Sequence, residues 1–395
     1  MPGQRTDVLV VGGGPAGATA AFQLATAGLQ VLLVDRAIFP RDKTCGESLS
    51  PGALGRLRAI GMWTPRADPS PGFTIPQGLS APVRGMRIRS PRGTTFIGRY
   101  KSGPSGPGLA IRRTLLDDEL LKSARARGVQ VMQGMEAASA EQTANGNAIV
   151  HVRATEGTTR TQIEAKRVVV ADGRQSFLAR ELGFIEKQDG LHGRHRYAIR
   201  AHCENVSDLS DLAEMHVGEG GYCGIAPLSK TSANICYVLF TDRLDMAPRT
   251  IEADFRRHLL AFPDIARRLE PARVQGEIRV AGPLRLTSKL QSRGPFIACG
   301  DTTGFLDPFT GEGIAHAIAC GVSGAEAVAT SLAGRTGSFH DYEREIRALR
   351  RVKGIAALLL YGLVSRRALA NSAASLFARM PRLGDAVVQL FGDQI

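Results

Sequence analysis

Residues 7–35 read DVLVVGGGPAGATAAFQLATAGLQVLLVD, and this stretch decides the fold. The apolar run at 7–11 is typical of a strand buried in a parallel sheet. A glycine-rich turn follows at once, and residues 18–28 then have a helical pattern of small and apolar side chains. A second apolar run, at 31–34, ends in an aspartate. The order strand, turn, helix, strand predicts a βαβ unit of an α/β sheet.

The glycines of this turn match the pattern G-x-G-x-x-G at Gly12, Gly14 and Gly17. The first permits a tight turn, the second lets the backbone approach a pyrophosphate, and the third lets the helix lie close to the strand. The helix N-terminus offers N–H groups to phosphates. Asp35 stands where a carboxylate would accept bonds from ribose hydroxyls. The pattern predicts dinucleotide binding, and the alternative is a glycine-rich βαβ turn without a ligand.

Composition narrows the class of protein. Of 395 residues, 43% are hydrophobic and 22% are charged, values that exclude a disordered or fibrous chain. Lys and Arg number 50 against 37 Asp and Glu, which gives a net charge of +13. Aromatic residues make up only 6%, and the basic residues are scattered, so we expect no nucleic-acid partner. The charge favours an anionic cofactor or contact with a lipid surface.

The six cysteines show neither a C-x-x-C pair nor zinc-ligand spacing. We interpret them as reduced thiols and expect no metal site. The N-terminus lacks the charged and apolar segments of a signal peptide, and no apolar run reaches the length needed to cross a bilayer. We therefore expect a cytoplasmic protein, with peripheral membrane association as an open alternative.

Two later segments identify the dinucleotide. Residues 168–180 read VVVADGRQSFLAR, a strand that runs into a turn, and residues 296–321 read FIACGDTTGFLDPFTGEGIAHAIACG, a strand, a loop and a helix that starts near Gly313. Together with the first motif, and in the same order along the chain, they resemble the three FAD signatures of the para-hydroxybenzoate hydroxylase-like flavoproteins. That superfamily includes aromatic hydroxylases, flavin-dependent halogenases and geranylgeranyl reductases. The resemblance implies FAD as the cofactor.

The resemblance also implies roles for individual residues. Asp301 matches the carboxylate that binds the ribityl chain, and Gly311 and Gly313 match the loop at the flavin ring. Asp172 matches the start of the D-G-x-x-S-x-x-R pattern, and Arg113 the family arginine near the cofactor. A surface turn or a helix salt bridge is the alternative for each. The implied cofactor-binding set is Gly12, Gly14, Ala16, Gly17, Asp35, Arg36, Cys45, Arg113, Asp172, Gly173, Gly300, Asp301, Pro308, Gly311, Gly313 and Ile314.

The stretch 40–61, PRDKTCGESLSPGALGRLRAIG, resembles the P-x-x-K-x-C-G-E segment of geranylgeranyl reductases. Halogenases share G-E-S here but need a lysine further on, and none occurs between Glu47 and Lys101. Aromatic hydroxylases usually carry His and Asn where this chain has Gly304 and Ala315. The reductase branch is therefore the closest resemblance. The tail at 367–393 is similar, more loosely, to flavoproteins encoded beside polyketide synthases.

Three residues are candidates for catalysis. Cys45 resembles a cysteine that lies beside the flavin in reductases, and the alternative is a small buried side chain that packs under the ring. Glu47 is a candidate acid or, alternatively, a cap of the helix that follows it. Tyr222, in the segment GGYCGIAPL, resembles an aromatic residue over the flavin pocket, and a core tyrosine of a sheet is the alternative.

The expected fold class is α/β: a Rossmann-type FAD-binding domain, an inserted and mainly antiparallel β substrate domain, and a C-terminal helical segment. We assign 1–64, 109–184 and 296–350 to the FAD-binding domain. Residues 65–108 and 185–295 form the substrate domain, and 351–395 the C-terminal helices. The apolar stretch IAALLLYGLV is interpreted as a core helix that closes the substrate pocket, with an interfacial helix as the alternative.

These features predict an FAD-dependent oxidoreductase that reduces a C=C bond of a lipophilic substrate of prenyl or polyketide type. NAD(P)H is the expected transient electron donor, because no second nucleotide-binding pattern occurs. The first alternative is an FAD monooxygenase that hydroxylates an aromatic or polyketide substrate. The second is a catalytically silent flavin-binding protein. The sequence does not determine the oligomeric state.

Overall fold

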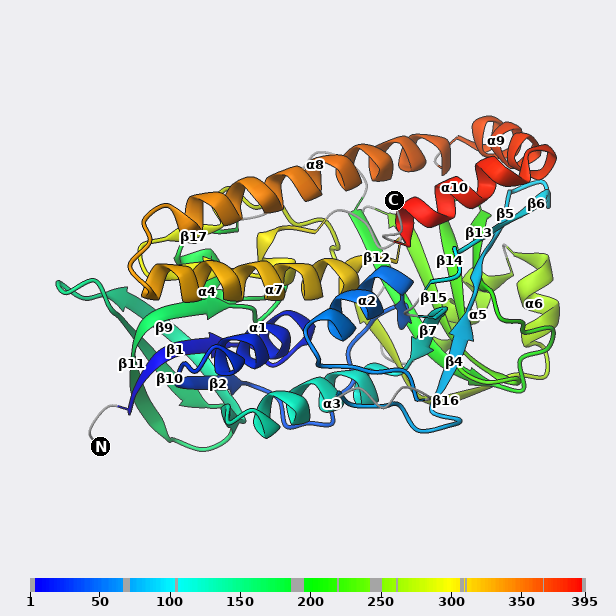
Figure 1. Cartoon of the computed structure of the whole chain (residues 1–395). Coiled ribbons are helices and arrows are strands. Elements are labelled where there is room, and N and C mark those ends of the chain that lie inside the picture. The colour runs from blue at the N-terminus through cyan, green and yellow to red at the C-terminus, as the bar shows by residue number, and fades with distance from the viewer. Residues whose placement is uncertain are drawn as a thin grey trace.

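The structure, a computed structural model, describes residues 4–66, 72–103, 106–185, 195–218, 220–241, 251–260, 262–305, 309, 311–364 and 366–392. Two sheets lie at opposite ends of an elongated molecule, and long helices connect them (Figure 1). The first sheet contains the βαβ unit, and the second is the larger part of the expected insertion. The α/β fold class with an antiparallel sheet and C-terminal helices is confirmed, whereas the expected domain boundaries stay a prediction.

The first sheet has eight strands in the order β17-β18-β11-β1-β2-β8, and a hairpin of β9 and β10 continues from β11. Its central pairs, β11 with β1 and β1 with β2, are parallel. All five residues of β2 are buried, as an apolar run in a parallel sheet predicts. The strand bounds are β1 Gln4–Val11, β2 Val31–Asp35, β8 Gln130–Gln133, β9 Met135–Gln142, β10 Ala148–Ala154, β11 Arg160–Val170, β17 Ser292–Arg293 and β18 Phe296–Ala298.

Helices α1 (Pro15–Thr26), α3 (Arg113–Ala126) and α7 (Gly313–Leu332) cover one face of this sheet and share its larger core. The β9–β10 hairpin and α4 (Phe177–Glu181) cover the other face. Two glycines allow the close packing of α1. A Cβ on Gly17 would lie 1.8 Å from the carbonyl oxygen of Gly12, and one on Gly321 would lie 2.5 Å from that of Ala16. The structure therefore shows the close approach of helix and strand that Gly17 was expected to allow.

The second sheet has seven strands in the order β16-β12-β15-β14-β13-β5-β6. All neighbours are antiparallel except β13 and β5. One face packs against α5 (Ile251–Leu259) and α6 (Pro263–Leu269), and the other packs against side chains that include Leu284, Phe309, Ala370 and Val388. The bounds are β5 Gly85–Arg89, β6 Thr95–Arg99, β12 His195–Glu204, β13 Ala213–Gly218, β14 Gly221–Pro227, β15 Ser232–Thr241 and β16 Arg273–Ala281.

A small sheet of β3 (Ser48–Leu49), β7 (Gly108–Ile111) and β4 (Ser80–Val83) lies between the two large ones. It leads into α2 (Pro51–Ala59), whose N-terminus is capped by the Ser50 hydroxyl, which accepts a bond from the amide of Ala53 at 3.2 Å. A 3-10 helix, η2 (Gly300–Thr303), joins β18 to the loop before α7.

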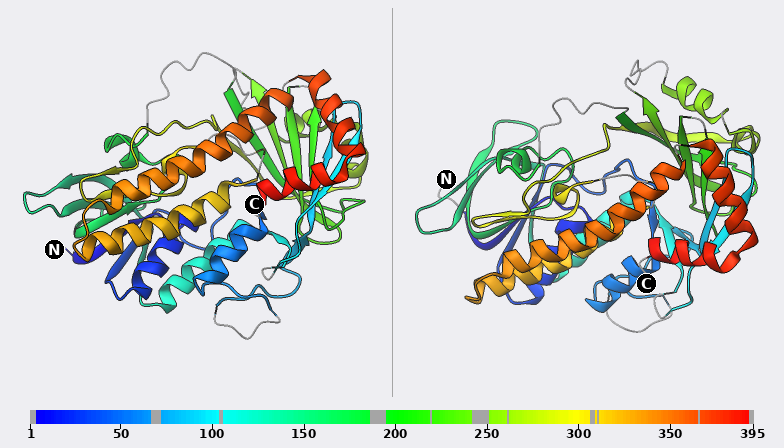
Figure 2. Two further views of the ribbon diagram at one scale, coloured as in Figure 1. Left: turned by 45° about the horizontal axis from the view of Figure 1, so that its top comes forward. Right: turned by 90° about the horizontal axis from the view of Figure 1, so that it is seen from above.

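The C-terminal helices return along the molecule to the second sheet (Figure 2). Helix α8 (Ser338–Val364) runs beside α7, and α9 (Arg367–Arg379) and α10 (Pro381–Phe391) cover the edge strand β6. Asp385 accepts a bond from the Arg99 amide at 2.7 Å, and Gln389 donates to the Arg99 carbonyl at 3.1 Å. Side chains of α10 thus satisfy backbone groups that an edge strand leaves unpaired.

The stretch IAALLLYGLV forms the end of α8, but its side chains, apart from one glycine, lie outside the description. Both interpretations of this stretch, core helix and interfacial helix, therefore stay predictions. Among the described residues, no helix has the length and apolar character that a membrane crossing requires.

Candidate active site

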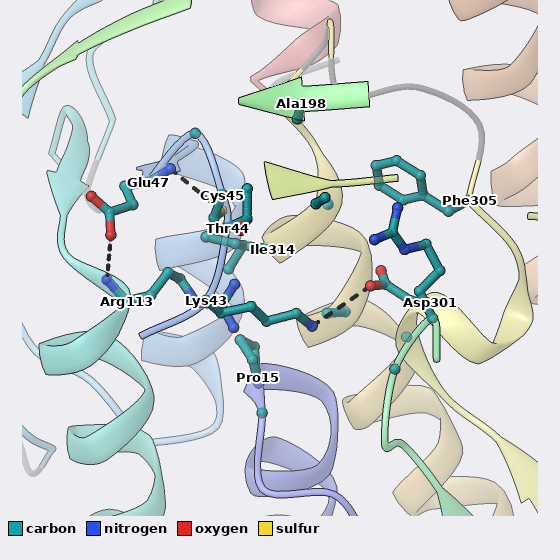
Figure 3. A pocket seen from close by; sticks show the side chains of 18 of the residues that line it. Pro15, Lys43, Thr44, Cys45, Glu47, Arg113, Ala198, Asp301, Phe305 and Ile314 are labelled. Carbon is teal, nitrogen blue, oxygen red and sulfur yellow. Dashed lines mark hydrogen bonds and ion pairs between the residues drawn. The ribbon is translucent and has the colours of Figure 1, made fainter. Parts of the chain in front are cut away.

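A cavity of about 1070 Å³ lies between the two large sheets. Its walls come from the glycine-rich turn, the loop 40–48, the turn after β11, η2 and the start of α7 on one side, and from strands of the second sheet on the other. Figure 3 shows how side chains from these distant segments converge on one space. The volume is at the upper end of the range for ligand pockets, about 300–1,000 Å³.

The glycine-rich turn presents backbone to this cavity. Gly12 has a φ of +104°, and a Cβ there would lie 2.5 Å from the Ala171 carbonyl oxygen, so only glycine fits. A Cβ on Gly14 would instead meet nothing closer than an Arg41 nitrogen at 3.5 Å. Helix α1 begins at Pro15 without a side-chain cap, so its first amides are available to an anionic ligand.

Asp35 lies at the end of β2, as expected, and it is buried at the cavity wall. One carboxylate oxygen accepts a bond from the Gly13 amide at 2.6 Å, and the other accepts one from the Ala37 amide at 2.7 Å. The side chain therefore fixes the turn. Each oxygen retains a free lone pair for a ribose hydroxyl, and that role stays a prediction. Arg36 also lines the cavity.

Asp172 supplies an observation that fits a bound ligand. Its Oδ1 atom is buried and has no hydrogen-bond partner among the described residues, although the residue lines the cavity. Burial raises the pKa of this carboxyl to about 6, against the opposing effect of a bond with Ser176. A buried acceptor without a donor is costly. A ligand hydroxyl in the cavity would satisfy it. Gly173 beside it has a φ of +84°.

Asp301 faces the cavity from η2, and Lys43 reaches across to it, with Nζ and Oδ2 3.8 Å apart (Figure 3). Burial lowers the pKa of Lys43 below its usual value, and the charge of Asp301 offsets part of this shift. Behind them, a Cβ on Gly300 would meet the Ala16 side chain at 2.9 Å, which keeps η2 close to α1. The remaining members of the predicted cofactor set that line the cavity here are Ala16, Gly311, Gly313 and Ile314. Pro308 lies outside the described residues.

Arg113 lines the cavity and also makes the helix salt bridge that was its alternative interpretation. Its guanidinium donates to both oxygens of Asp117 at 2.8 and 2.6 Å, and both residues are buried. Burial lowers the pKa of Arg113, but Asp117 and then the Cys45 thiol raise it above its usual value. The guanidinium therefore places a permanent positive charge beside Cys45.

Cys45 lies half-buried in the loop that leads from the cavity to β3. The Asn234 side chain of β15 donates to the Cys45 carbonyl at 2.7 Å. The Glu47 amide contacts the Cys45 sulfur at 3.4 Å. The cysteine loop is thus bound to the second sheet as well as to the first.

Glu47 is fully buried and has a φ of +55°, a left-handed conformation that is rare for a residue with a side chain. Oε1 accepts a bond from the Arg113 amide at 2.9 Å, which caps α3. The expectation that Glu47 caps the next helix is wrong, because Ser50 caps α2 and Glu47 reaches a helix that starts 66 residues later.

The second oxygen of Glu47 lies 2.7 Å from His202 Nε2 on β12. Arg200 Nη1 lies 3.0 Å from His202 Nδ1, and an arginine can only donate, so Nδ1 accepts and the imidazole proton is on Nε2. Both carboxylate oxygens of Glu47 therefore receive donors. With both oxygens occupied in this way, Glu47 is an anchor of the cysteine loop.

This anchor is not among the residues predicted from the sequence. Arg200 and His202 are buried, and Arg200 also donates to Asp42 in the cysteine loop, to which Arg279 of β16 is bound at 3.1 Å. The run HRYAIRAHCE gives the signal that could have found it. In a strand, its alternation places Arg200 and His202 on one face, and the apolar Ile199 and Ala201 on the other. Such alternation identifies the polar face of the strand, but it does not indicate that Glu47 and Asp42 bind there.

Tyr222 lies on β14, almost fully buried, and lines the cavity. Its ring meets those of Phe309 and Phe240 edge to face, with centroid distances of 4.9 and 6.1 Å. The residue is therefore both a cavity wall and part of the sheet core. The cavity wall on this side is mostly apolar and includes Met86, Ala198, Met215, Val238, Leu284, Phe305 and Phe391.

Comparison with known proteins agrees with this geometry. The sequence profile of the family described as "FAD binding domain" matches residues 5–350. A menaquinone reductase of Mycobacterium tuberculosis is 30% identical over 339 residues, which cover 81% of this chain and 76% of that protein.

Two solved structures share the fold. A flavin-dependent brominase superposes with a TM-score of 0.82 at 22% identity and covers 98% of this chain and 94% of its own. A geranylgeranyl bacteriochlorophyll reductase-like protein from Thermoplasma acidophilum has a TM-score of 0.74 at 21% identity, with 99% and 92% covered.

Proposed function

The chain belongs to the FAD binding domain family and is an FAD-dependent oxidoreductase, and on this premise we propose that it reduces a carbon–carbon double bond in a lipophilic substrate of prenyl or polyketide type. The observation that carries the proposal is the continuity of one cavity, which is polar at the glycine-rich turn and apolar at the second sheet. Such a space suits a charged cofactor at one end and an uncharged hydrophobic molecule at the other.

The residues present fit FAD. The turn at 12–17 and the start of α1 would hold the pyrophosphate, Asp35 and Asp172 would accept bonds from hydroxyls, and Asp301 would bind the ribityl chain. The uncapped N-terminus of α7 would lie at the flavin ring. When bound, FAD supplies hydride transfer.

The walls of the second sheet exclude water and position the substrate. Reduction of a double bond needs one hydride and one proton. Since both oxygens of Glu47 are occupied by His202 and the Arg113 amide, the proton would come from water or from another group that lines the cavity. Cys45, which lines the cavity beside the Arg113 guanidinium, is the candidate.

NAD(P)H is the proposed electron donor. The chain has a single nucleotide-binding pattern, so the donor would bind transiently at the cavity. Arg174 and Lys43 line the cavity and offer cationic partners for its phosphates.

A reaction under nitrogen tests this function. The protein, loaded with FAD, is reduced with NADPH and then mixed with menaquinone, whose prenyl chain is unsaturated and which the related reductase is named for. We expect the flavin to be reoxidised without oxygen and the product to gain two hydrogen atoms. The gain in mass persists after exposure to air when the double bond is reduced, whereas a quinol would return to the quinone.

Reoxidation that requires oxygen, with a product heavier by one oxygen atom, would contradict the reductase and support the monooxygenase. Failure of the flavin to accept electrons from any donor would support the silent flavin-binding protein.

A further inference from the structure

Exposed apolar side chains gather on the two last helices. Four of the ten large apolar side chains that are exposed in the described part of the chain lie within residues 369–383. They are Leu369, Leu376, Met380 and Leu383, and between 38% and 51% of each is exposed. We refer to these four residues as the α9–α10 face. It lies at the end of the molecule opposite the N-terminus (Figure 1).

The positions of these residues follow from helical geometry. Leu369 and Leu376 are spaced by seven residues, so they share one side of α9, and Met380 directly follows the last residue of that helix. The opposite side carries the buried Ala370 and Ala374. Leu383 lies in the first turn of α10, where its amide donates to the Met380 carbonyl at 2.9 Å. The helix pair therefore packs inward with Ala370, Ala374, Phe377, Val388 and Phe391, and it leaves a second set of apolar side chains exposed on its outer side.

Arginines flank the α9–α10 face. Arg366, Arg367, Arg379 and Arg382 are all exposed. The only acidic residue within 366–392 is Asp385, so this segment has a net charge of +3. Asp385 is half-buried and accepts a bond from the Arg99 amide on the side that faces β6. The outward side thus combines leucine and methionine with positive charge, the pattern of a helix that lies in the interface of a bilayer.

The same helix reaches the cavity. From Leu383, α10 runs for eight residues, about 12 Å, to the buried Phe391, which lines the cavity wall. Two contacts fix this end: the Gly52 amide of α2 donates to the Gly392 carbonyl at 3.0 Å, and a Cβ on Gly392 would lie 2.7 Å from the Tyr100 ring. A surface in contact with the α9–α10 face is therefore separated from the apolar cavity by the length of one short helix.

We propose that the α9–α10 face docks the protein on an anionic lipid bilayer. Both parts of the face are complementary to such a surface, since the apolar side chains enter the acyl boundary and the arginines meet lipid phosphates. A second copy of the chain fits less well. A two-fold interface would place the same patch on both sides, and the arginines of one copy would face those of the other.

Vesicle sedimentation with the full FAD-loaded chain and no substrate tests the proposal. Vesicles of phosphatidylcholine with phosphatidylglycerol are compared with vesicles of phosphatidylcholine alone. We expect binding to the anionic vesicles, and at least about tenfold weaker partition for the triple variant L376S/M380S/L383S. The variant R379E/R382E should lose the preference for anionic lipid and the sensitivity of binding to salt.

A matched control removes three exposed apolar side chains elsewhere. Ile38, Leu79 and Leu260 are as exposed as the residues of the α9–α10 face or more so, and they lie far from it in sequence. The variant I38S/L79S/L260S should partition like the unchanged protein. Circular dichroism and FAD content establish that each variant is folded.

Three results would overturn the docking surface. One is the absence of binding to anionic vesicles, and another is equal loss of binding in the control variant. The third is a dimer in light scattering that only L376S/M380S/L383S converts to a monomer, because the face would then belong to a second copy. Since no turnover is measured, failure of this test leaves the proposed reaction unaffected, and failure of the reaction leaves the docking surface unaffected.

Discussion

At the scale of the residue, the buried glutamate of the cysteine loop has a near copy on β13 of the second sheet. Glu47 is bound by His202 and the Arg113 amide, and Glu214 is bound by His216 at 2.8 Å and Arg268 at 2.8 Å. Both glutamates are buried. Only Glu47 holds the loop of Cys45. A comparison of variants at the two positions therefore distinguishes the general effect of losing a buried carboxylate from a specific effect on the cysteine.

We predict that E47Q and E214Q both destabilise the protein, by about 1–3 kcal/mol, because each loses a charged acceptor of buried hydrogen bonds. Only E47Q should change the rate at which Cys45 reacts with iodoacetamide, because only Glu47 fixes the loop of this cysteine. Denaturant unfolding gives the stability, and mass spectrometry of the labelled peptide gives the rate. Equal labelling rates in the two variants would mean that Glu47 does not position the cysteine.

Asp172 makes the stability of the FAD-free protein depend on pH. Its pKa is raised to about 6 in the folded protein, above the ordinary value of 3.8, so the folded state binds more protons than the unfolded state between these pH values. Stability therefore falls as pH rises from about 4 to 6, by up to about 3 kcal/mol. The variant D172N should lack this fall. Urea unfolding at a series of pH values measures it, and identical slopes in both proteins would contradict the assignment.

At the scale of the element, the packing of α1 depends on a glycine. A Cβ on Gly17 would lie 1.8 Å from the Gly12 carbonyl oxygen, a backbone atom that cannot move aside. We predict that G17A costs more than about 2 kcal/mol and lowers FAD content, because α1 must move away from β1. Gly362, in α8, is the matched control, since a Cβ there meets nothing within 4 Å. G362A should be neutral or stabilising in thermal unfolding.

How far the sequence predicts the elements depends on whether their partners are local. The strand at 7–11, the turn and the helix α1 are encoded in 29 consecutive residues, and the structure places them as expected. The bond from Glu47 to the start of α3 joins residues 66 positions apart, and no local pattern indicates it. The same holds for α10, whose Asp385 meets β6 across 286 residues.

At the scale of the whole molecule, the cavity is assembled from segments spread over nearly the full chain, and the C-terminal helix closes it. Gly98 of β6 makes this closure possible, because a Cβ there would lie 2.4 Å from both the Val388 side chain and the Gly384 carbonyl oxygen. Phe391, on the same helix, lines the cavity, and the neighbouring Gly392 contacts Gly52 of α2 and the Tyr100 ring rather than the glycine-rich turn. Cofactor and substrate contacts are therefore separable.

We predict that G98A moves α10 away from β6 and weakens the binding of a lipophilic ligand by about tenfold or more, while FAD content stays close to that of the unchanged protein. Quenching of flavin fluorescence by menaquinone measures the first quantity, and the flavin absorbance of the purified protein measures the second. I97A is the matched control, because Ile97 directly precedes Gly98 in β6 and is exposed. If G98A released FAD and ligand together, α10 would support the whole cavity and the two sets of contacts would be one unit.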